Sequence, residues 1–371
     1  MAASIKKVSA ASARAHTRKQ KQGSSPSLPP GMFKKISLVV LVGLAAWFYN
    51  VIQPPAPAIC GTPNGPLVTS SRIKLRDGRH LAYLEAGVPK AKAAHKIIYI
   101  HGFASCKHDL LPVSPDLAEE LGIYLVGFDR AGYGESDPDP KKSVKSTALD
   151  IEQLADQLSL GPKFYVIGFS MGGELTWGCL KYISHRLAGA ALIAPVGNYW
   201  WPGFPSNVSK EAYSMQLAPD KWAVGVAHYA PWLTYWWNTQ NLFPSSSVIA
   251  GRIEIFSAED LKVLSKFQGR PYTAYVTQQG LFESLHRDMI VGFGSWEFDP
   301  LDLDDIFAGK EGLVHLWHGT EDWIVPVILS QYVSQKHPWI KYHEVPGAGH
   351  LFPLADGMAD AIVKALVQGK N

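Results

Sequence analysis

Cysteine is scarce in this chain of 371 residues, which has only Cys60, Cys106 and Cys179. The three form no CxxC pair and no Cys/His cluster at metal-ligand spacing, so the sequence predicts no structural metal. A chain of this length can bury a large core and does not need a disulfide-stapled scaffold. One disulfide could form in an oxidising compartment, but three free thiols are the simpler expectation. A Walker-type GxxxxGK motif and a complete GxGxxG motif are also missing, so we expect no nucleotide or other cofactor.

Acidic residues are absent from the first 50 positions, although basic residues are common there. The basic side chains in this stretch are Lys6, Lys7, Arg14, Arg18, Lys19, Lys21, Lys34 and Lys35. Removing these eight charges from the net charge of +3 leaves a body of 3 − 8 = −5. A body of that sign is a poor surface for nucleic acid, so a nucleic-acid partner is not expected.

A mostly apolar, uncharged run extends over residues 36–52 and ends before Pro54-Pro55. As a helix it spans roughly 26 Å, close to the thickness of the endoplasmic-reticulum bilayer. Lys34 and Lys35 precede the run and Trp47 lies near its far end, which is typical of an anchor with a cytosolic N-terminus. We therefore expect a basic, disordered tail over 1–35, a single-pass anchor over 36–52 in a secretory membrane, and a luminal body.

Two other interpretations of the N-terminus remain open. The first 30 residues are rich in Ser, Ala, Arg and Lys, as in transit peptides of chloroplasts or mitochondria. The apolar run could also be a signal-peptide core, with Ala56-Pro57-Ala58 as the cleavage site. Asn207 opens a glycosylation sequon that matters only if the body is luminal. A proline-rich linker over 53–69 is expected to join the apolar run to the body.

The body alternates short apolar strands with helical stretches. We expect strands at 72–77, 80–87, 97–100, 124–128, 164–167, 190–194, 314–317 and 340–345, and helices at 115–121, 143–158, 171–185, 327–336 and 354–367. Near-continuous apolar runs are typical of strands buried on both faces. The pattern predicts an α/β fold, with an eight-stranded, mostly parallel sheet and helices on both faces. Its core would comprise residues 70–196 and 306–371.

The segment 197–305 differs in composition from this core. It holds Trp200, Trp201, Trp222, Trp232, Trp236, Trp237 and Trp296. We interpret it as a helical cap inserted after the sixth strand. Most of these rings are expected to build the core of the cap, and some to line an apolar substrate pocket or touch a membrane.

A strand running directly into Gly168-Phe169-Ser170-Met171-Gly172 and then into a helix has the context of a nucleophile elbow. The turn is so tight that its neighbours must be nearly free of side chains, hence Gly168 and Gly172. It would present the Ser170 hydroxyl at the helix N-terminus, where the dipole favours developing negative charge. Ser170 is therefore the candidate nucleophile.

A serine hydroxyl needs a base, and His350 is the candidate among 13 histidines. It follows the last predicted strand in the glycine-rich loop 346–350. The orienting acid should lie between nucleophile and base along the chain. Asp322, in the loop after the seventh strand, fits that order better than the adjacent Glu321.

An oxyanion hole needs two backbone N–H groups. Met171, the residue after the nucleophile, would supply one. The loop that follows the third strand would supply the other from Phe103. Gly102 would let the chain turn there and His101 would brace the loop.

Taken together, HGF at 101–103, DRAGYGES at 129–136, GFSMGG at 168–173, HGTED at 318–322 and GAGH at 347–350 resemble the α/β-hydrolase fold superfamily. Within it, NYWWPGFPSN, HYAPWLTYWWNTQ and ESLHRDM are similar to membrane-anchored plant α/β-hydrolases of unassigned substrate. The resemblance implies Ser170, Asp322 and His350 as a catalytic triad, with Phe103 and Met171 as oxyanion donors.

The expected function is a serine hydrolase that cleaves a carboxylic ester or thioester through an acyl-enzyme, without metal or organic cofactor. The expected partners are a small-molecule substrate with an apolar portion and, through the N-terminal helix, a membrane. The alternative is a ligand receptor or binding module on the same fold with little or no turnover.

Overall fold

The computed structural model describes residues 30–266, 273–309 and 312–369. The chain divides into two compact units, Met1–Val51 and Ile52–Asn371, which are described separately. Most of the predicted N-terminal tail, residues 1–29, lies outside the described residues.

The first unit contains the apolar helix predicted near the N-terminus, α1 (Pro30–Ile52). Its stretch Gly31–Ile52 has a mean hydropathy of 1.8 and is long and apolar enough to cross a membrane. Such a helix serves equally well as an anchor or as a signal sequence. It begins six residues before the predicted run, so the end of the expected disordered tail is helical instead. Proline fits the first turn of a helix, and lysines are good helix formers.

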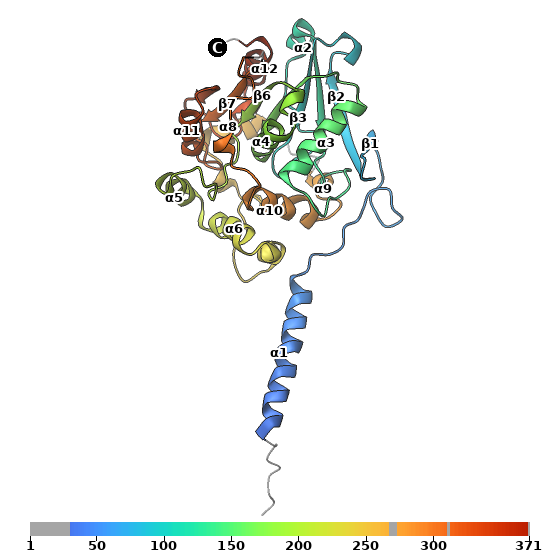
Figure 1. Ribbon diagram of the computed structural model, residues 1–371, viewed down its shortest axis with the longest axis vertical. Helices are drawn as coiled ribbons and strands as arrows, with labels where there is room; N and C mark the ends of the chain where they lie inside the picture. Colours follow the sequence, from blue (N-terminus) through green and yellow to red (C-terminus); the bar gives the residue numbers. More distant parts are fainter. Residues whose placement is uncertain (1–29, 267–272, 310–311, 370–371) are drawn as a thin grey trace, which may run out of the picture. The chain divides into compact units, whose positions relative to one another are not determined.

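The second unit is built on a mixed sheet with the strand order β1-β2-β4-β3-β5-β6-β7-β8 (Figure 1). The strands are β1 (Arg72–Lys74), β2 (His80–Gly87), β3 (His95–Ile100), β4 (Ile123–Phe128), β5 (Phe164–Phe169), β6 (Leu187–Ile193), β7 (Val314–Gly319) and β8 (Ile340–Val345). β2 runs antiparallel to both of its neighbours, β1 and β4, and all other pairs are parallel. The predicted eight-stranded, mostly parallel sheet is confirmed.

Helices cover both faces of this sheet (Figure 1). They are α2 (Pro115–Leu121), α3 (Val144–Gln157), α4 (Met171–Tyr182), α11 (Val327–Lys336) and α12 (Met358–Gln368). Successive side chains of β3 enter different cores: Ile98 and Ile100 pack with α3 and α4, whereas Ile97 and Tyr99 pack with α2 and α12. Burial on both faces explains why these strands read as continuous apolar runs.

The segment between β6 and β7 is helical, as the sequence predicts. It holds α5 (Ser206–Met215), α6 (Ala218–Tyr229), α7 (Thr234–Thr239), α8 (Ala258–Lys266), α9 (Thr273–Val276), a π-helical turn (Phe282–His286) and α10 (Arg287–Phe293). Its aromatic rings differ in burial: Trp201 packs on Trp296, whereas Trp222 and Trp232 are exposed. Some of the rings therefore do build a core. The boundaries of a separate cap at 197 and 305 stay a prediction.

The proline-rich stretch after α1 is hydrogen-bonded to the body of the second unit. The Ala58 N–H donates to the carbonyl of Gln279, and the Cys60 N–H donates to its side-chain oxygen, both at 3.0 Å. Further along, the Ser70 N–H donates to Glu135 at 2.9 Å. From Ala58 onward the expected linker is thus attached to the body of the second unit.

The three cysteines are buried free thiols, which agrees with the simpler of the two expectations. Burial raises the pKa of the Cys60 thiol to about 11 and that of Cys179 to about 12. Both are therefore protonated and unreactive at neutral pH.

Helix α4 approaches strand β3 so closely that a side chain cannot fit between them. A Cβ atom on Gly172 would lie 2.0 Å from the Ile100 carbonyl oxygen. We expect Gly172→Ala to lower the free energy of unfolding by at least about 2 kcal/mol, because the backbone must move apart. Gly225, inside α6, is the matched control: its Cβ would meet only the Tyr213 hydroxyl, at 3.4 Å. Gly225→Ala should change stability by less than about 1 kcal/mol, in the stabilising direction. Urea unfolding of the two variants measures the difference, and equal stabilities would contradict it.

Candidate active site

Ser170 stands at the turn between β5 and α4 with an unusual backbone conformation. Its φ of 55° and ψ of −120° lie outside the regions that side-chain-bearing residues normally adopt. The surrounding structure enforces this strain. The Ser170 N–H donates to the Ile193 carbonyl at 2.8 Å, and the Ser170 carbonyl accepts from Glu174 at 3.0 Å and Val196 at 3.2 Å. Strain of this kind is typical of functional residues.

Two more glycines let the chain pack tightly around Ser170. A Cβ atom on Gly168 would lie 2.2 Å from the Gly172 carbonyl oxygen. One on Gly102, in the loop after β3, would lie 3.2 Å from the Ser170 Cβ. The predicted oxyanion loop is thus in contact with the predicted nucleophile, and the glycines predicted for this turn lie where a side chain would clash.

The structure brings His350 and Asp322 together from the loops after β8 and β7. The His350 Nδ1 lies 2.7 Å from Asp322 Oδ2. Because a carboxylate only accepts hydrogen bonds, Nδ1 carries the proton and Nε2 is left as the basic nitrogen. The other carboxylate oxygen, Oδ1, accepts from the N–H groups of Ile324 at 2.9 Å and Val325 at 2.8 Å. The alternative acid, Glu321, is exposed.

Burial disfavours both charges of this pair, but their attraction outweighs it. The pKa of Asp322 is held well below its usual range, because His350 and His318 overcome the burial of the carboxylate. The pKa of His350 is raised above the ordinary value of 6.5, because Asp322 overcomes the effect of burial on the imidazole. Asp322 is therefore ionised, and His350 accepts a proton more readily than a free histidine does.

His318 is a second histidine at Asp322 that sequence reasoning missed. Its Nε2 lies 3.2 Å from Asp322 Oδ2 and 3.0 Å from the Val325 carbonyl oxygen. Its Nδ1 lies 2.7 Å from the Ser330 hydroxyl. His318 lies near the end of β7, four residues before the acid, and that spacing was the only signal available.

The loop after β3 is fixed by bonds to the Gly102 carbonyl. It accepts from His101 Nδ1 at 2.8 Å and from the Arg130 guanidinium at 2.9 Å. The Arg130 N–H donates in turn to His101 Nε2 at 3.1 Å. Burial and the Arg130 charge hold the pKa of His101 well below 6.5, so its ring is neutral. His101 braces the loop, as its sequence position predicts.

The N–H groups of Phe103 and Met171 are not hydrogen-bonded to any group in the described ranges. Both residues line one cavity together with Ser170 and His350. The His350 ring also lies 5.0 Å, between centroids, from the ring of Phe169, the residue before Ser170. Four of the five predicted site residues therefore line one cavity. The fifth, Asp322, does not line it but is hydrogen-bonded to His350.

Arg130 belongs to a buried ion network that joins the β4 loop to α10. Its guanidinium contacts the Asp288 carboxylate at 2.5 and 2.7 Å. Lys142 and the Tyr133 hydroxyl donate to the same carboxylate at 3.0 and 2.9 Å. The two cations outweigh burial and hold the pKa of Asp288 well below its usual range. Arg130 and Asp288 lie in two of the motifs that carry the family resemblance. The contact between them was not predicted from the sequence.

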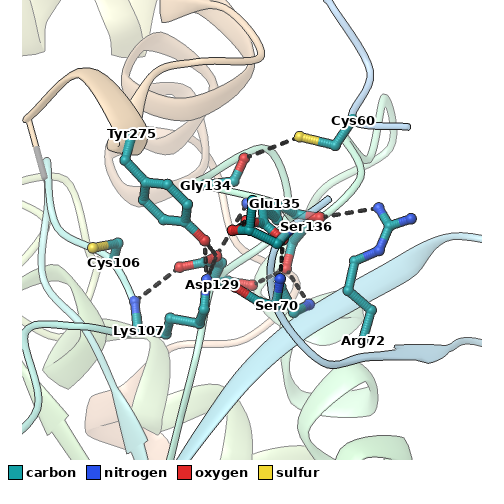
Figure 2. Close-up of polar contacts among 12 residues, drawn as sticks. Cys60, Ser70, Arg72, Cys106, Lys107, Asp129, Gly134, Glu135, Ser136 and Tyr275 are labelled. Carbon is teal, nitrogen blue, oxygen red and sulfur yellow. Dashed lines mark hydrogen bonds and ion pairs between the residues drawn. The ribbon is translucent and has the colours of Figure 1, made fainter. Parts of the chain in front are cut away.

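A second buried cluster, centred on Asp129, links the loops after β3 and β4 to α9 (Figure 2). Its carboxylate accepts from the Lys107 ammonium at 3.0 Å, the Tyr275 hydroxyl at 2.5 Å and the Glu135 N–H at 3.0 Å. Lys107 also contacts Tyr275 directly. Lys107 lies in the loop that carries Phe103, and Tyr275 belongs to α9. This cluster therefore connects the loop after β3, the predicted oxyanion loop, to the helical segment.

The cavity above Ser170 has a volume of about 610 Å³ and is mainly apolar. Its apolar walls come from β3 and the loop after it, the end of β5, the helical segment and the C-terminal region. They include Tyr99, Leu110, Phe169, Tyr199, Leu217, Val224, Met289, Phe293, Trp323 and Leu354. A site of this size holds a small organic ligand. Across 30–266, 273–309 and 312–369, no group of three or more His, Cys, Asp or Glu side chains is placed to hold a metal ion.

Comparison with known proteins agrees with this fold. Over residues 96–356 the chain matches the family described as the alpha/beta hydrolase fold. It is 23% identical to the probable lysophospholipase BODYGUARD 2 and 24% identical to BODYGUARD 1, both of Arabidopsis thaliana. Each match covers 70% of this chain and 55% of the relative, so the chain spans about half the length of these relatives.

Among solved structures, the fold is similar to that of an esterase from Thermogutta terrifontis. The TM-score is 0.52 at 18% identity, covering 81% of this chain and 99% of that one. An enol-lactonase from Burkholderia xenovorans is similar with a TM-score of 0.55 at 15% identity, covering 79% of this chain and 98% of that one. At these identities the likeness concerns the fold alone. The match over residues 96–356, which is more than half of the chain, shows that this protein belongs to the α/β-hydrolase fold family.

Proposed function

We propose that this protein is a serine hydrolase that cleaves a carboxylic ester or thioester through an acyl-enzyme. One observation carries the proposal: His350, bonded to a buried ionised Asp322, lines the same cavity as Ser170 in its strained turn. A strained serine, a base of raised pKa and an orienting acid are the parts that such a reaction needs.

In this mechanism the Ser170 hydroxyl attacks the substrate carbonyl while His350 Nε2 takes its proton. Asp322 holds Nδ1–H and stabilises the imidazolium that forms. The carbonyl oxygen gains negative charge and accepts from the Phe103 and Met171 N–H groups, at the positive end of α4. His350 then protonates the departing alcohol or thiol, leaving an acyl group on Ser170. Water, activated by His350, removes the acyl group in the same way and restores the serine.

The apolar cavity favours a substrate with a lipid-like portion. The two Arabidopsis relatives are named as probable lysophospholipases, which points in the same direction. Burying an acyl chain contributes about 0.8 kcal/mol per methylene, so chain length should govern affinity. The helical segment contributes the α6 side chain of Val224 and the α10 side chains of Met289 and Phe293 to this apolar wall.

We also propose that α1 anchors the protein as a single-pass helix, with the body on the luminal side of the endoplasmic reticulum or another secretory membrane. Lysines precede the apolar stretch and Trp47 lies toward its end, in the order expected for that orientation. Asn207, the sequon asparagine, is exposed at the start of α5, where a glycan could be attached. Import into a chloroplast or mitochondrion is the alternative.

A fluorophosphonate probe tests the nucleophile. We expect it to label the purified full-length protein and Ser170→Ala to lose all labelling, because the probe reacts only with an activated serine. Ser105→Ala is the matched control, since Ser105 lines the same cavity but has no histidine base assigned to it. Its labelling should persist. Absence of labelling in the wild type would favour the receptor alternative, and labelling that survives Ser170→Ala would show another nucleophile.

The histidine sets the pH dependence. His350 must be neutral to accept the serine proton, and Asp322 raises its pKa, so kcat/KM should fall as pH drops through a midpoint above 6.5. In Asp322→Asn the raising charge is lost, and the midpoint of the residual activity should move to lower pH. That activity should be about ten-thousand-fold below the wild type, since the tautomer is no longer fixed. An unchanged midpoint in this variant would contradict the pairing.

A further inference from the structure

The cavity is lined by acidic side chains but by no lysine or arginine among the described residues. Among the described lining residues there is no lysine or arginine, whereas two carboxylates, Asp109 and Asp220, line it. An anionic ligand group would therefore enter a mainly apolar space with no lysine or arginine among the described lining residues to pair with. Burying an unpaired charge is costly, and bringing it near like charges adds repulsion.

Asp220, in the first turn of α6, presents one oxygen that the protein does not use. Its Oδ1 accepts from the Ser246 hydroxyl at 2.8 Å and the Ser247 N–H at 2.7 Å. Its Oδ2 has no hydrogen bond to any of the described residues, and the side chain is part of the cavity wall. A carboxylate held by neutral donors alone keeps its capacity to accept further hydrogen bonds.

Gln216, four residues earlier, is a second acceptor in the same wall. Its Nε2 donates to the Ile324 carbonyl at 3.1 Å, so the amide is oriented with Oε1 left over as an acceptor. Buried acceptors demand donors from whatever fills the cavity. A phosphate or carboxylate offers only acceptors at neutral pH, whereas a hydroxyl can donate.

We propose that this cavity recognises an uncharged ester that carries free hydroxyl groups, such as an acyl ester of a polyol, with Asp220 as the specificity-determining residue. The inference rests on the proposed ester hydrolysis. A hydroxyl suits the apolar surroundings better than a cation, because a cation would have to lose its hydration for a carboxylate already shared by two donors. The apolar walls hold the acyl chain, and Asp220 and Gln216 accept hydrogen bonds from the hydroxyl groups of the polyol.

The test uses the full-length protein in detergent and four esters with the same acyl chain: methyl, glycerol, glycerol phosphate and choline. We expect kcat/KM for the glycerol ester to exceed that for the glycerol phosphate ester at least about tenfold, the effect of one hydrogen bond to a charged group. Equal or faster cleavage of the phosphate ester would overturn the proposal. Faster cleavage of the choline ester than of the glycerol ester would also overturn the proposal, because it would indicate recognition of a cation.

The variant Asp220→Asn tests whether Asp220 causes the preference for the glycerol ester over the methyl ester. The amide keeps an oxygen for Ser246 and Ser247 but loses the charge, so the ratio of glycerol to methyl ester kcat/KM should fall about tenfold. Ser246→Ala, which removes one loop contact and keeps the carboxylate, is the matched control and should move this ratio much less. Equal shifts in both variants would show a structural role for Asp220 and overturn the proposal. If Asp220→Asn does not fold, the wild-type comparison of the four esters still decides.

Failure of this inference is distinguishable from failure of the proposed function. Cleavage of the methyl ester together with labelling of Ser170 establishes the hydrolase, whatever the head-group preference. If neither occurs with any ester, the hydrolase proposal itself fails, and this inference fails with it.

Discussion

The contact between α4 and β3 is the constraint on which the rest of the site depends. Glycine at 172 lets the first turn of α4 lie against the Ile100 carbonyl. Glycine at 102 lets the loop after β3 lie against Ser170. This proximity brings Phe103, Met171 and Ser170 to the wall of one cavity, and the N–H groups of Phe103 and Met171 have no hydrogen bond to any of the described residues. A wider turn would separate the proposed nucleophile from the proposed oxyanion donors. The positive φ of Ser170 is the strain that accompanies the tight approach.

The loops around this contact are held by buried ions. Asp288 binds Arg130 and Lys142 from across the chain, and Asp129 binds Lys107. Removing one partner from such a cluster leaves an uncompensated charge and costs about 3–5 kcal/mol. The clusters therefore set where the loop after β3 lies relative to α9 and α10. They couple this loop to the helical segment, which contributes residues to the cavity wall.

The strand and helix pattern could be predicted from the sequence because it is local. Periodic apolar runs located all eight strands, and loop composition located Ser170, Asp322 and His350 at the ends of their strands. Contacts between distant segments carry no such pattern. Arg130 and Asp288 are 158 positions apart, so nothing in either motif indicated their pairing. The attachment of residues 58–70 to the body, and the free oxygen of Asp220, likewise depend on tertiary structure.

The central claim is that Ser170 carries the acyl group during turnover. Acid quenching during the reaction of a long-chain ester, followed by peptide mass spectrometry, measures this directly. The account predicts a mass increase equal to the acyl group on the peptide that contains Ser170, and none in Ser170→Ala. Turnover without any adduct on this peptide, or an adduct on another residue, would contradict it.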